Sequence, residues 1–218
     1  MQIDILTLFP PMFTGPFDYS IVKRAIDKKI LDLRITDLRD FATDKYKSVD
    51  DRPYGGGAGM IMRVDIVDRA ITNVKSQMSN QIQKSKIILL DAGGEKFTQQ
   101  KAVDLSKEDH LIIICGHYEG VDYRVHEHLV DEIISVGDYV LSGGEIPAMV
   151  IIDSIVRLLP GVLGNEKSLE EESFTEYRIP NTEYPQYTRP EEYNGWKVPE
   201  ILLSGDHTKI KKWRSPVR

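Results

Sequence analysis

Residues 134–145 read ISVGDYVLSGGE and join a short apolar segment to a longer, mostly apolar one. Three of these residues are glycines: Gly137, Gly143 and Gly144. Glycine tolerates positive φ values and lets the backbone approach a ligand closely, and backbone amides just before a helix can bind polar or anionic groups. The stretch is therefore typical of a binding loop between a buried strand and a helix. A tight strand-to-helix connection without a ligand explains the same residues.

Two further segments repeat this order of apolar strand, glycines and helix-like pattern. KIILLD (Lys86–Asp91) is followed by a predicted turn at 92–94, and LIIIC (Leu111–Cys115) by one at 116–120. Strands that are apolar throughout and alternate with helices predict a parallel α/β sheet with helices on both faces. Ligands bind such sheets beyond the carboxyl ends of the strands. We therefore expect residues 91–94, 116–120 and 137–144 to lie along one rim.

The remaining patterns complete the α/β domain and are assigned by hydrophobic period. Residues 37–62 form a long polar, glycine-rich connection, and loops of that length are usually functional or disordered. Ser20 is the predicted N-cap of the first helix. Strands are predicted at Ile3–Phe9, Leu31–Ile35 and Ile133–Val136, and helices at Ser20–Ile30, Val64–Met78, Thr98–Ser106, Val121–Leu129 and Ile146–Leu159.

Composition and charge limit the class of protein. The 218 residues are 41% apolar and carry a net charge of −6, as in ordinary globular proteins. No apolar run approaches the roughly 18 residues of a membrane span, and the N-terminus lacks a signal-peptide pattern. We therefore expect a cytoplasmic protein without membrane contact. The single cysteine, Cys115, fits a reducing compartment, and its apolar surroundings predict a packing role.

Several common sites are excluded because their motifs are missing. Residues 55–59 lack the Gly-Lys-Ser/Thr of a P-loop, and the chain has no G-x-G-x-x-G turn and no G-x-S-x-G elbow. The five histidines and one cysteine have poor metal-ligand spacing, so we expect no metal site. The glycine turns, with Glu119, Asp138 and Glu145 beside them, can hold a nucleotide-like ligand and supply a general base. This set of residues points to group transfer.

The domain organisation follows from a change in composition near residue 164. We predict a catalytic domain at 1–163, a flexible acidic linker at 164–173 and a small, mostly helical C-terminal domain at 174–218. Residues 197–218 hold six Lys or Arg against two acidic residues. With Trp196 and Trp213, this basic segment can contact the phosphates and bases of a nucleic acid. A solvated helix face explains the same charges.

Five motifs occur in order along the chain: PYGGGAGMIM at 53–62, ICGHYEGVD at 114–122, VGDYVLSGGEIPAM at 136–149, PGVLGN at 160–165 and YPQYTRP at 184–190. Together they resemble the bacterial tRNA (guanine-N1)-methyltransferase family over essentially the whole chain. The resemblance implies a deep trefoil knot, threaded by the segments around Gly116 and 136–145. It also implies S-adenosylmethionine as methyl donor, a homodimer with a shared active site, and the anticodon stem-loop of tRNA, not DNA, as partner. The target would be the guanosine immediately 3′ of the anticodon.

The resemblance assigns site residues by motif position. The catalytic residues would be Glu172 as the general base, Arg157 as stabiliser of negative charge on guanine O6, and Asp50 as a residue that supports activity. Family members usually carry aspartate where Glu172 stands, so Glu170 and Glu171 remain alternatives. The S-adenosylmethionine pocket would comprise Leu90, Gly116, Tyr118, Glu119, Val136, Gly137, Asp138, Tyr139, Val140, Leu141, Gly143 and Gly144.

Two other positions depart from the family pattern: His117, where many members have arginine, and Tyr123, where many have glutamate. Two alternative functions also remain open. One is a related knotted methyltransferase that acts on ribose 2′-oxygen or on ribosomal RNA. The other is a non-catalytic RNA-binding module that depends on the basic C-terminal segment alone.

Overall fold

The structure is a computed structural model that describes residues 1–78, 84–164 and 184–214. The chain divides into two compact units, Met1–Gly164 and Asn165–Arg218, and each is considered by itself. Residues 165–173 of the predicted linker lie outside the described residues. The domain boundaries at 163 and 173 therefore stay predictions.

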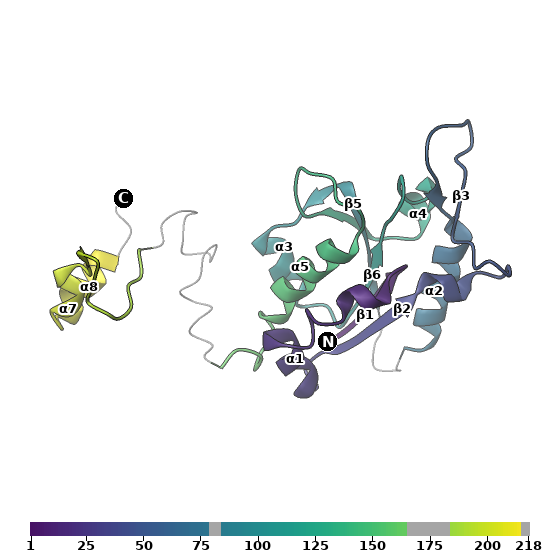
Figure 1. Cartoon of the computed structure of the whole chain (residues 1–218). Coiled ribbons are helices and arrows are strands. Elements are labelled where there is room, and N and C mark those ends of the chain that lie inside the picture. Colours follow the sequence, from purple (N-terminus) through teal and green to yellow (C-terminus); the bar gives the residue numbers. More distant parts are fainter. Residues whose placement is uncertain (79–83, 165–183, 215–218) are drawn as a thin grey trace. The chain divides into compact units, whose positions relative to one another are not determined.

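Five parallel strands form the main sheet of the first unit, in the order β2-β1-β6-β5-β7 (Figure 1). All neighbouring pairs run parallel, so the predicted parallel α/β class is confirmed. The carboxyl ends of parallel strands point to the same edge of a sheet, and this edge carries the loops considered below. The strands are β1 (Gln2–Thr7), β2 (Asp32–Asp37), β5 (Lys86–Lys96), β6 (His110–Cys115) and β7 (Glu132–Ser135).

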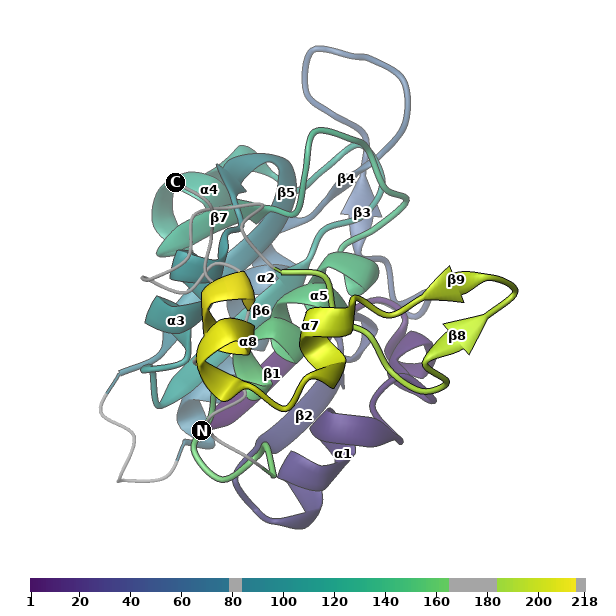
Figure 2. The same ribbon diagram turned by 90° about the vertical axis from the view of Figure 1, so that its left-hand side faces the viewer.

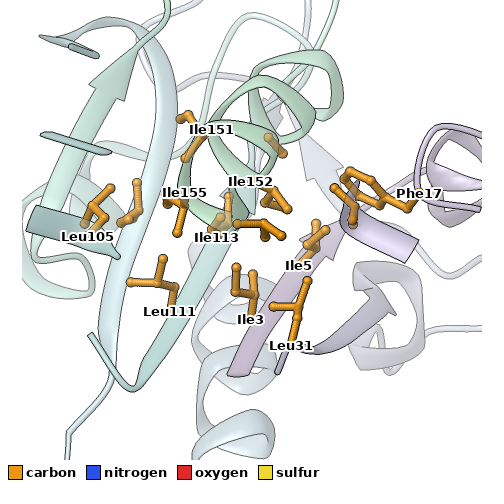
Figure 3. Close-up of a cluster of buried hydrophobic side chains, with 14 of the residues drawn as sticks. Ile3, Ile5, Phe17, Leu31, Leu105, Leu111, Ile113, Ile151, Ile152 and Ile155 are labelled. Carbon is orange, nitrogen blue, oxygen red and sulfur yellow. The ribbon is translucent and has the colours of Figure 1, made fainter. Parts of the chain in front are cut away.

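Helices cover both faces of this sheet, as predicted. Alternate residues of β6 join different cores: Ile113 packs in the first, which Figure 3 shows, and Ile112 and Ile114 pack in the second. All six residues of β6 are buried, which explains why the strand is apolar throughout instead of alternating. The first core includes residues of α1 (Ser20–Asp27), α3 (Gln99–Leu105) and α5 (Glu145–Val156), and the second includes residues of α2 (Val64–Ser76) and α4 (Tyr123–His128).

Strand β5 is longer than predicted, and the expected glycine turn at 92–94 is wrong. The strand continues through Gly93 and Gly94 to Lys96, with a shift of its register against β7 between Leu90 and Glu95. A Cβ atom on Gly94 would lie 2.6 Å from the carbonyl carbon of Ile133. The glycine is needed because the backbones of two strands approach closely here, not because the chain turns.

Helix boundaries also differ from the prediction in detail. Ser20 is the first residue of α1, and the N-cap position belongs to Tyr19, whose side chain makes no capping hydrogen bond. The proline pair after β1 begins a short 3-10 helix, η1 (Pro10–Phe13), because the fixed φ of proline suits a first helical turn. No helix within the described ranges has the length and apolar character needed to cross a membrane.

The long connection at 37–62 contains ordered elements. It begins with a 3-10 helix, η2 (Leu38–Phe41), and then β3 (Asp50–Asp51) pairs antiparallel with β4 (Ile61–Met62). Met62 is buried and also forms an isolated bridge with Val121. The connection is therefore anchored to the turn that follows β6.

The second unit is small and is built around aromatic contacts. Figure 2 shows the hairpin of β8 (Glu192–Tyr193) and β9 (Trp196–Lys197), and the two short helices α7 (Glu200–Leu203) and α8 (His207–Arg214). The Trp213 ring lies 6.3 Å from that of Tyr184 and 6.5 Å from that of Tyr187. Asp206 accepts hydrogen bonds from the amides of Thr208 and Lys209 at the start of α8.

The first core is expected to dominate the stability of the first unit. Replacing the fully buried Ile113 by alanine should lower the free energy of unfolding by about 2–5 kcal/mol, because it leaves a cavity in a close-packed layer. Urea denaturation followed by circular dichroism measures this change. Ile35→Ala on the edge strand β2 is the matched control, because Ile35 is 37% exposed and should cost less than about 1 kcal/mol. Equal losses for the two variants would contradict this view of the core.

Candidate functional site

A pocket of about 210 Å³ lies where the loops after β6 and β7 meet β5. Three separate segments line it, together with Pro147 in the first turn of α5. The structure thus brings together the three parts of the chain expected along one rim, although Gly93 and Gly94 do not line the pocket because they lie within β5. The lining residues are Leu90, Asp91, Ala92, Gly116, His117, Tyr118, Glu119, Gly120, Ile134, Ser135, Val136, Gly137, Tyr139, Val140, Leu141, Ser142, Gly143, Gly144 and Pro147.

Eleven of the twelve residues predicted to contact the methyl donor line this pocket. The exception is Asp138, which does not line it and whose carboxylate pairs with Lys96 of β5. Both side chains of this pair are largely exposed, so the pair contributes little to stability. Asp138 can help to hold the loop against β5, while its neighbours face the pocket.

Close approach of backbones explains the glycines of this site. A Cβ atom on Gly144 would lie 2.6 Å from Cα of Cys115, and one on Gly143 would lie 2.2 Å from the His117 ring. The Gly144 amide also donates a hydrogen bond of 2.9 Å to the Gly116 carbonyl. Protein interiors are close-packed, so no side chain fits at either position without moving its neighbours. The loop before α5 is therefore pressed against the end of β6.

A buried carboxylate fixes the elements beneath the pocket. Glu145, the first residue of α5, is 1% exposed and accepts hydrogen bonds from Thr7 Oγ1 at 2.5 Å and from His117 Nε2 at 2.6 Å. Thr7 Oγ1 in turn accepts a hydrogen bond from the Phe9 amide, and the Phe9 ring packs edge-on against His117. A buried charge is costly unless it is paired and hydrogen-bonded. The network therefore ties together the end of β1, the turn after β6 and the start of α5.

Tyr118 links the pocket to Asp50, one of the predicted catalytic residues. The Tyr118 hydroxyl interacts with Asp50 and also with Arg39 of η2. Burial raises the pKa of Tyr118, and the nearby Asp50 carboxylate raises it further. The phenol is therefore protonated at neutral pH and can donate a hydrogen bond. Tyr118 has a φ of 61°, a left-handed conformation that is rare outside glycine.

The glycine-rich loop at 53–60 is attached to the same turn. The Glu119 amide donates to the Met60 carbonyl at 3.0 Å, and the Met62 amide donates to the Gly120 carbonyl at 3.0 Å. Gly59 has a φ of 78°, and a Cβ atom there would lie 2.3 Å from Cγ of Glu119. A movement of this loop must therefore disturb a turn that lines the pocket.

The other two predicted catalytic residues do not join the pocket within the described part of one chain. Arg157 is the C-cap of α5, whereas the pocket lies at the N-terminal end of that helix. At 1.5 Å of rise per residue, about 18 Å of helix separates Glu145 from Arg157. Glu172, with its alternatives Glu170 and Glu171, lies outside the described residues.

Four polar residues at or near the pocket received no role from the sequence. Asp91 follows an apolar strand, Thr7 ends one, and Arg39 is one of several charges in a polar segment, so none carried a motif signal. His117 was visible only as a departure from the family pattern. The described residues contain no cluster of His, Cys, Asp or Glu that could hold a metal ion.

Comparisons with known proteins agree over the length of the chain. The profile of the family described as tRNA (Guanine-1)-methyltransferase TrmD matches residues 1–218. The tRNA (guanine-N(1)-)-methyltransferase of Dictyoglomus turgidum is 53% identical over 214 residues, which are 98% of this chain and 83% of that protein. The protein of the same name from Bacillus cereus is 51% identical over 214 residues, 98% of this chain and 85% of that one. A crystal structure of tRNA (m1G37) methyltransferase from Aquifex aeolicus has a TM-score of 0.79 at 40% identity, covering 98% of this chain and 87% of that chain.

The contact of Gly144 with Cys115 should be sensitive to a single methyl group. Gly144→Ala should lower the free energy of unfolding by about 1–3 kcal/mol, because overpacking displaces the loop from the end of β6. Chemical denaturation measures the loss. Gly164→Ala is the matched control, since Gly164 has an ordinary φ and nothing lies within 4 Å of its added Cβ. A Gly144→Ala protein as stable as this control would show that the loop is not held by close contact.

Proposed function

The chain belongs to the tRNA (guanine-1)-methyltransferase family, and we propose that it transfers a methyl group from S-adenosylmethionine to N1 of the guanosine immediately 3′ of the tRNA anticodon. The product would be 1-methylguanosine. The observation that carries the proposal is the pocket, because eleven residues expected to contact the methyl donor line it together.

The pocket has the chemistry that a nucleoside-containing donor requires. Leu90, Ile134, Val136, Leu141 and Pro147 supply apolar surface for the adenine ring, and the glycines expose backbone groups for its polar edges. The volume of about 210 Å³ is below the roughly 300–1,000 Å³ of most ligand pockets, so we expect it to enclose only part of the donor. When bound, the sulfonium group supplies an electrophilic methyl group.

The acceptor must lose a proton before it can react. Guanine N1 carries a hydrogen at neutral pH, and its lone pair becomes available only when a base removes that proton. We assign the base to the carboxylate of Glu172, with Glu170 and Glu171 as alternatives. Arg157 would stabilise the negative charge that develops on guanine O6. Asp50, through its interaction with Tyr118, would position the turn that lines the pocket.

A homodimer would bring Arg157 to the pocket of a second copy. Within one chain about 18 Å of α5 separates Arg157 from the pocket, too far for one side chain to bridge. The exposed apolar side chains of Phe9, Met12, Ile146 and Val150 offer a surface for such a partner. Phe9 directly precedes η1 and Met12 lies in it, and η1 contacts α5, which holds Ile146 and Val150. Exposed apolar side chains grouped in this way often mark a protein interface.

The second unit supports contact with RNA. Helix α8 carries Lys209, Lys211, Lys212 and Arg214 in its eight residues, and Trp196 is exposed on β9. Lysine and arginine can neutralise phosphates, and exposed aromatic rings can stack on unpaired bases. We propose tRNA as its partner. We also propose that the loop at 136–145 belongs to a trefoil knot, supported by the match to a fold of this family.

The proposed activity is tested with purified protein, labelled S-adenosylmethionine and anticodon stem-loop transcripts. We expect 1-methylguanosine at the guanosine 3′ of the anticodon, identified by mass spectrometry of the digested nucleosides. A 2′-O-methyl product would favour a different knotted methyltransferase. RNA binding without methyl transfer would favour a non-catalytic binding module. Either result would refute the proposal.

The same assay identifies the base among three adjacent carboxylates. Glu172→Gln should lower the turnover number about 10²–10⁴-fold, because the amide cannot accept the N1 proton. Glu170→Gln and Glu171→Gln are the matched controls and should retain most of it. Affinity for S-adenosylhomocysteine should stay unchanged in all three variants. If the Glu172→Gln variant keeps the full turnover number, Glu172 is not the base.

The shared site predicts complementation between two inactive variants. Arg157→Ala lacks the proposed charge stabiliser. Gly116→Val should block donor binding, because it places a bulky side chain at a pocket-lining position where an added Cβ atom already lies 3.1 Å from the Leu90 carbonyl oxygen. Random mixing of the two chains should restore about a quarter of the wild-type activity, because half of the dimers then hold one intact site of two. Differently tagged chains allow the mixed dimers to be isolated and assayed. Mixed dimers without activity would place both residues in one subunit's site.

A further inference from the structure

Asp91 is a pocket-lining carboxylate for which motif and family resemblance gave no role. It follows Leu90 in β5, and its Oδ1 accepts a hydrogen bond of 2.8 Å from the Gly93 amide. Across residues 1–78, 84–164 and 184–214, nothing donates a hydrogen bond to Oδ2, which lies 3.8 Å from His126 Nε2. One oxygen therefore fixes the carboxylate, and the other keeps its lone pairs for a ligand.

We propose that Asp91 determines specificity for the methyl donor by accepting hydrogen bonds from its ribose hydroxyls. The inference rests on the proposed function and extends it by one contact. Carboxylates that follow buried strands of parallel sheets can bind the hydroxyls of a nucleotide ribose, because a carboxylate oxygen accepts from such donors at close range.

The position of Asp91 favours the ribose over the adenine ring. The buried Leu90 side chain supplies apolar surface directly before it, and Val136 and Pro147 supply more. An adenine ring packs on such apolar surface, whereas the attached ribose carries the neutral hydrogen-bond donors of the nucleoside. Asp91 is the first polar side chain of β5 beyond this apolar surface, where the ribose would begin.

His126 provides a second observation that concerns Asp91. Its Nδ1 is buried and has no hydrogen-bond partner among the residues that the structure describes, and its ring stacks on Tyr123 at 5.2 Å. The other carboxylate near it, Asp122, is paired with Arg124 at 2.7 Å. A buried polar atom without a partner lowers stability, so an apolar ring would suit this position better. An imidazole beside Asp91 is explained if it orients that carboxylate, with His126 Nε2 3.8 Å from Asp91 Oδ2.

Calorimetry with S-adenosylhomocysteine and its 2′-deoxy and 3′-deoxy analogues tests the proposal. Asp91→Asn should weaken the binding of S-adenosylhomocysteine about tenfold, the loss of one charge-assisted hydrogen bond. At least one deoxy analogue should bind wild type about tenfold more weakly and be insensitive to Asp91→Asn. Asp27→Asn, on the exposed face of α1, is the matched control and should leave the affinities for all three ligands unchanged.

His126→Phe separates a positioning role from a structural one. The aromatic ring keeps the stacking on Tyr123 and removes the unpartnered nitrogen, so the protein should be at least as stable as wild type. His126→Phe should bind S-adenosylhomocysteine about two- to threefold more weakly than wild type. The double variant Asp91→Asn/His126→Phe should bind it as strongly as Asp91→Asn does.

Three outcomes would overturn the inference. If Asp91→Asn binds S-adenosylhomocysteine as wild type does, Asp91 makes no contact with the donor. If Asp91→Asn weakens all three ligands equally, the carboxylate meets a group other than the ribose. If wild-type protein binds none of the three ligands, the proposed function itself fails and the inference fails with it.

Discussion

The buried carboxylate of Glu145 is the constraint on which the pocket depends. It lies at the start of α5 and needs the donors from Thr7 and His117, because an unpaired charge in this position would destabilise the fold. Those two donors come from the end of β1 and from the turn after β6. Satisfying one charge therefore fixes three elements that are far apart in the sequence, and the loop at 134–144 must fit between them.

Glycine makes that fit possible. Gly143 and Gly144 lie against His117 and the end of β6 with no space for a methyl group, so the loop reaches the sheet edge as bare backbone. The result is a pocket whose surface combines main-chain groups with apolar side chains. Such a surface can hold a nucleoside firmly. Arg157 is not part of it, because Arg157 lies at the opposite end of α5 from the pocket. The proposed function therefore assigns donor binding and proton transfer to different parts of the chain, and the proposed homodimer would complete the site.

Much of the fold could be predicted from the sequence because buried parallel strands are apolar throughout. Lys86–Asp91 and Leu111–Cys115 have this pattern, and the turn after β6 carries its glycines where a ligand would bind. The extension of β5 was missed because Gly93 and Gly94 look like a turn, and only the position of β7 shows that they permit close strand packing. Asp91 was expected on the ligand-binding rim but received no role, because it carries no motif signal of its own at the end of a strand.

For the functional site, the sequence predicted the pocket residues but not the contacts between distant segments. Motif resemblance gave the pocket residues, because these are short runs whose local order decides their contacts. The distance between Arg157 and the pocket depends on the direction of α5, which a motif does not contain. The Glu145 network and the contact of Tyr118 with Asp50 join residues that are distant in sequence, and a single sequence has no signal for such pairs.

The central claim is that the glycine-lined pocket holds the methyl donor. A crystal structure of the protein grown with S-adenosylhomocysteine tests it most directly. We expect density for the adenosine group between Leu90, the turn at 116–120 and the loop at 136–144. Density for the ligand at another place on the chain, with this pocket empty, would contradict the claim.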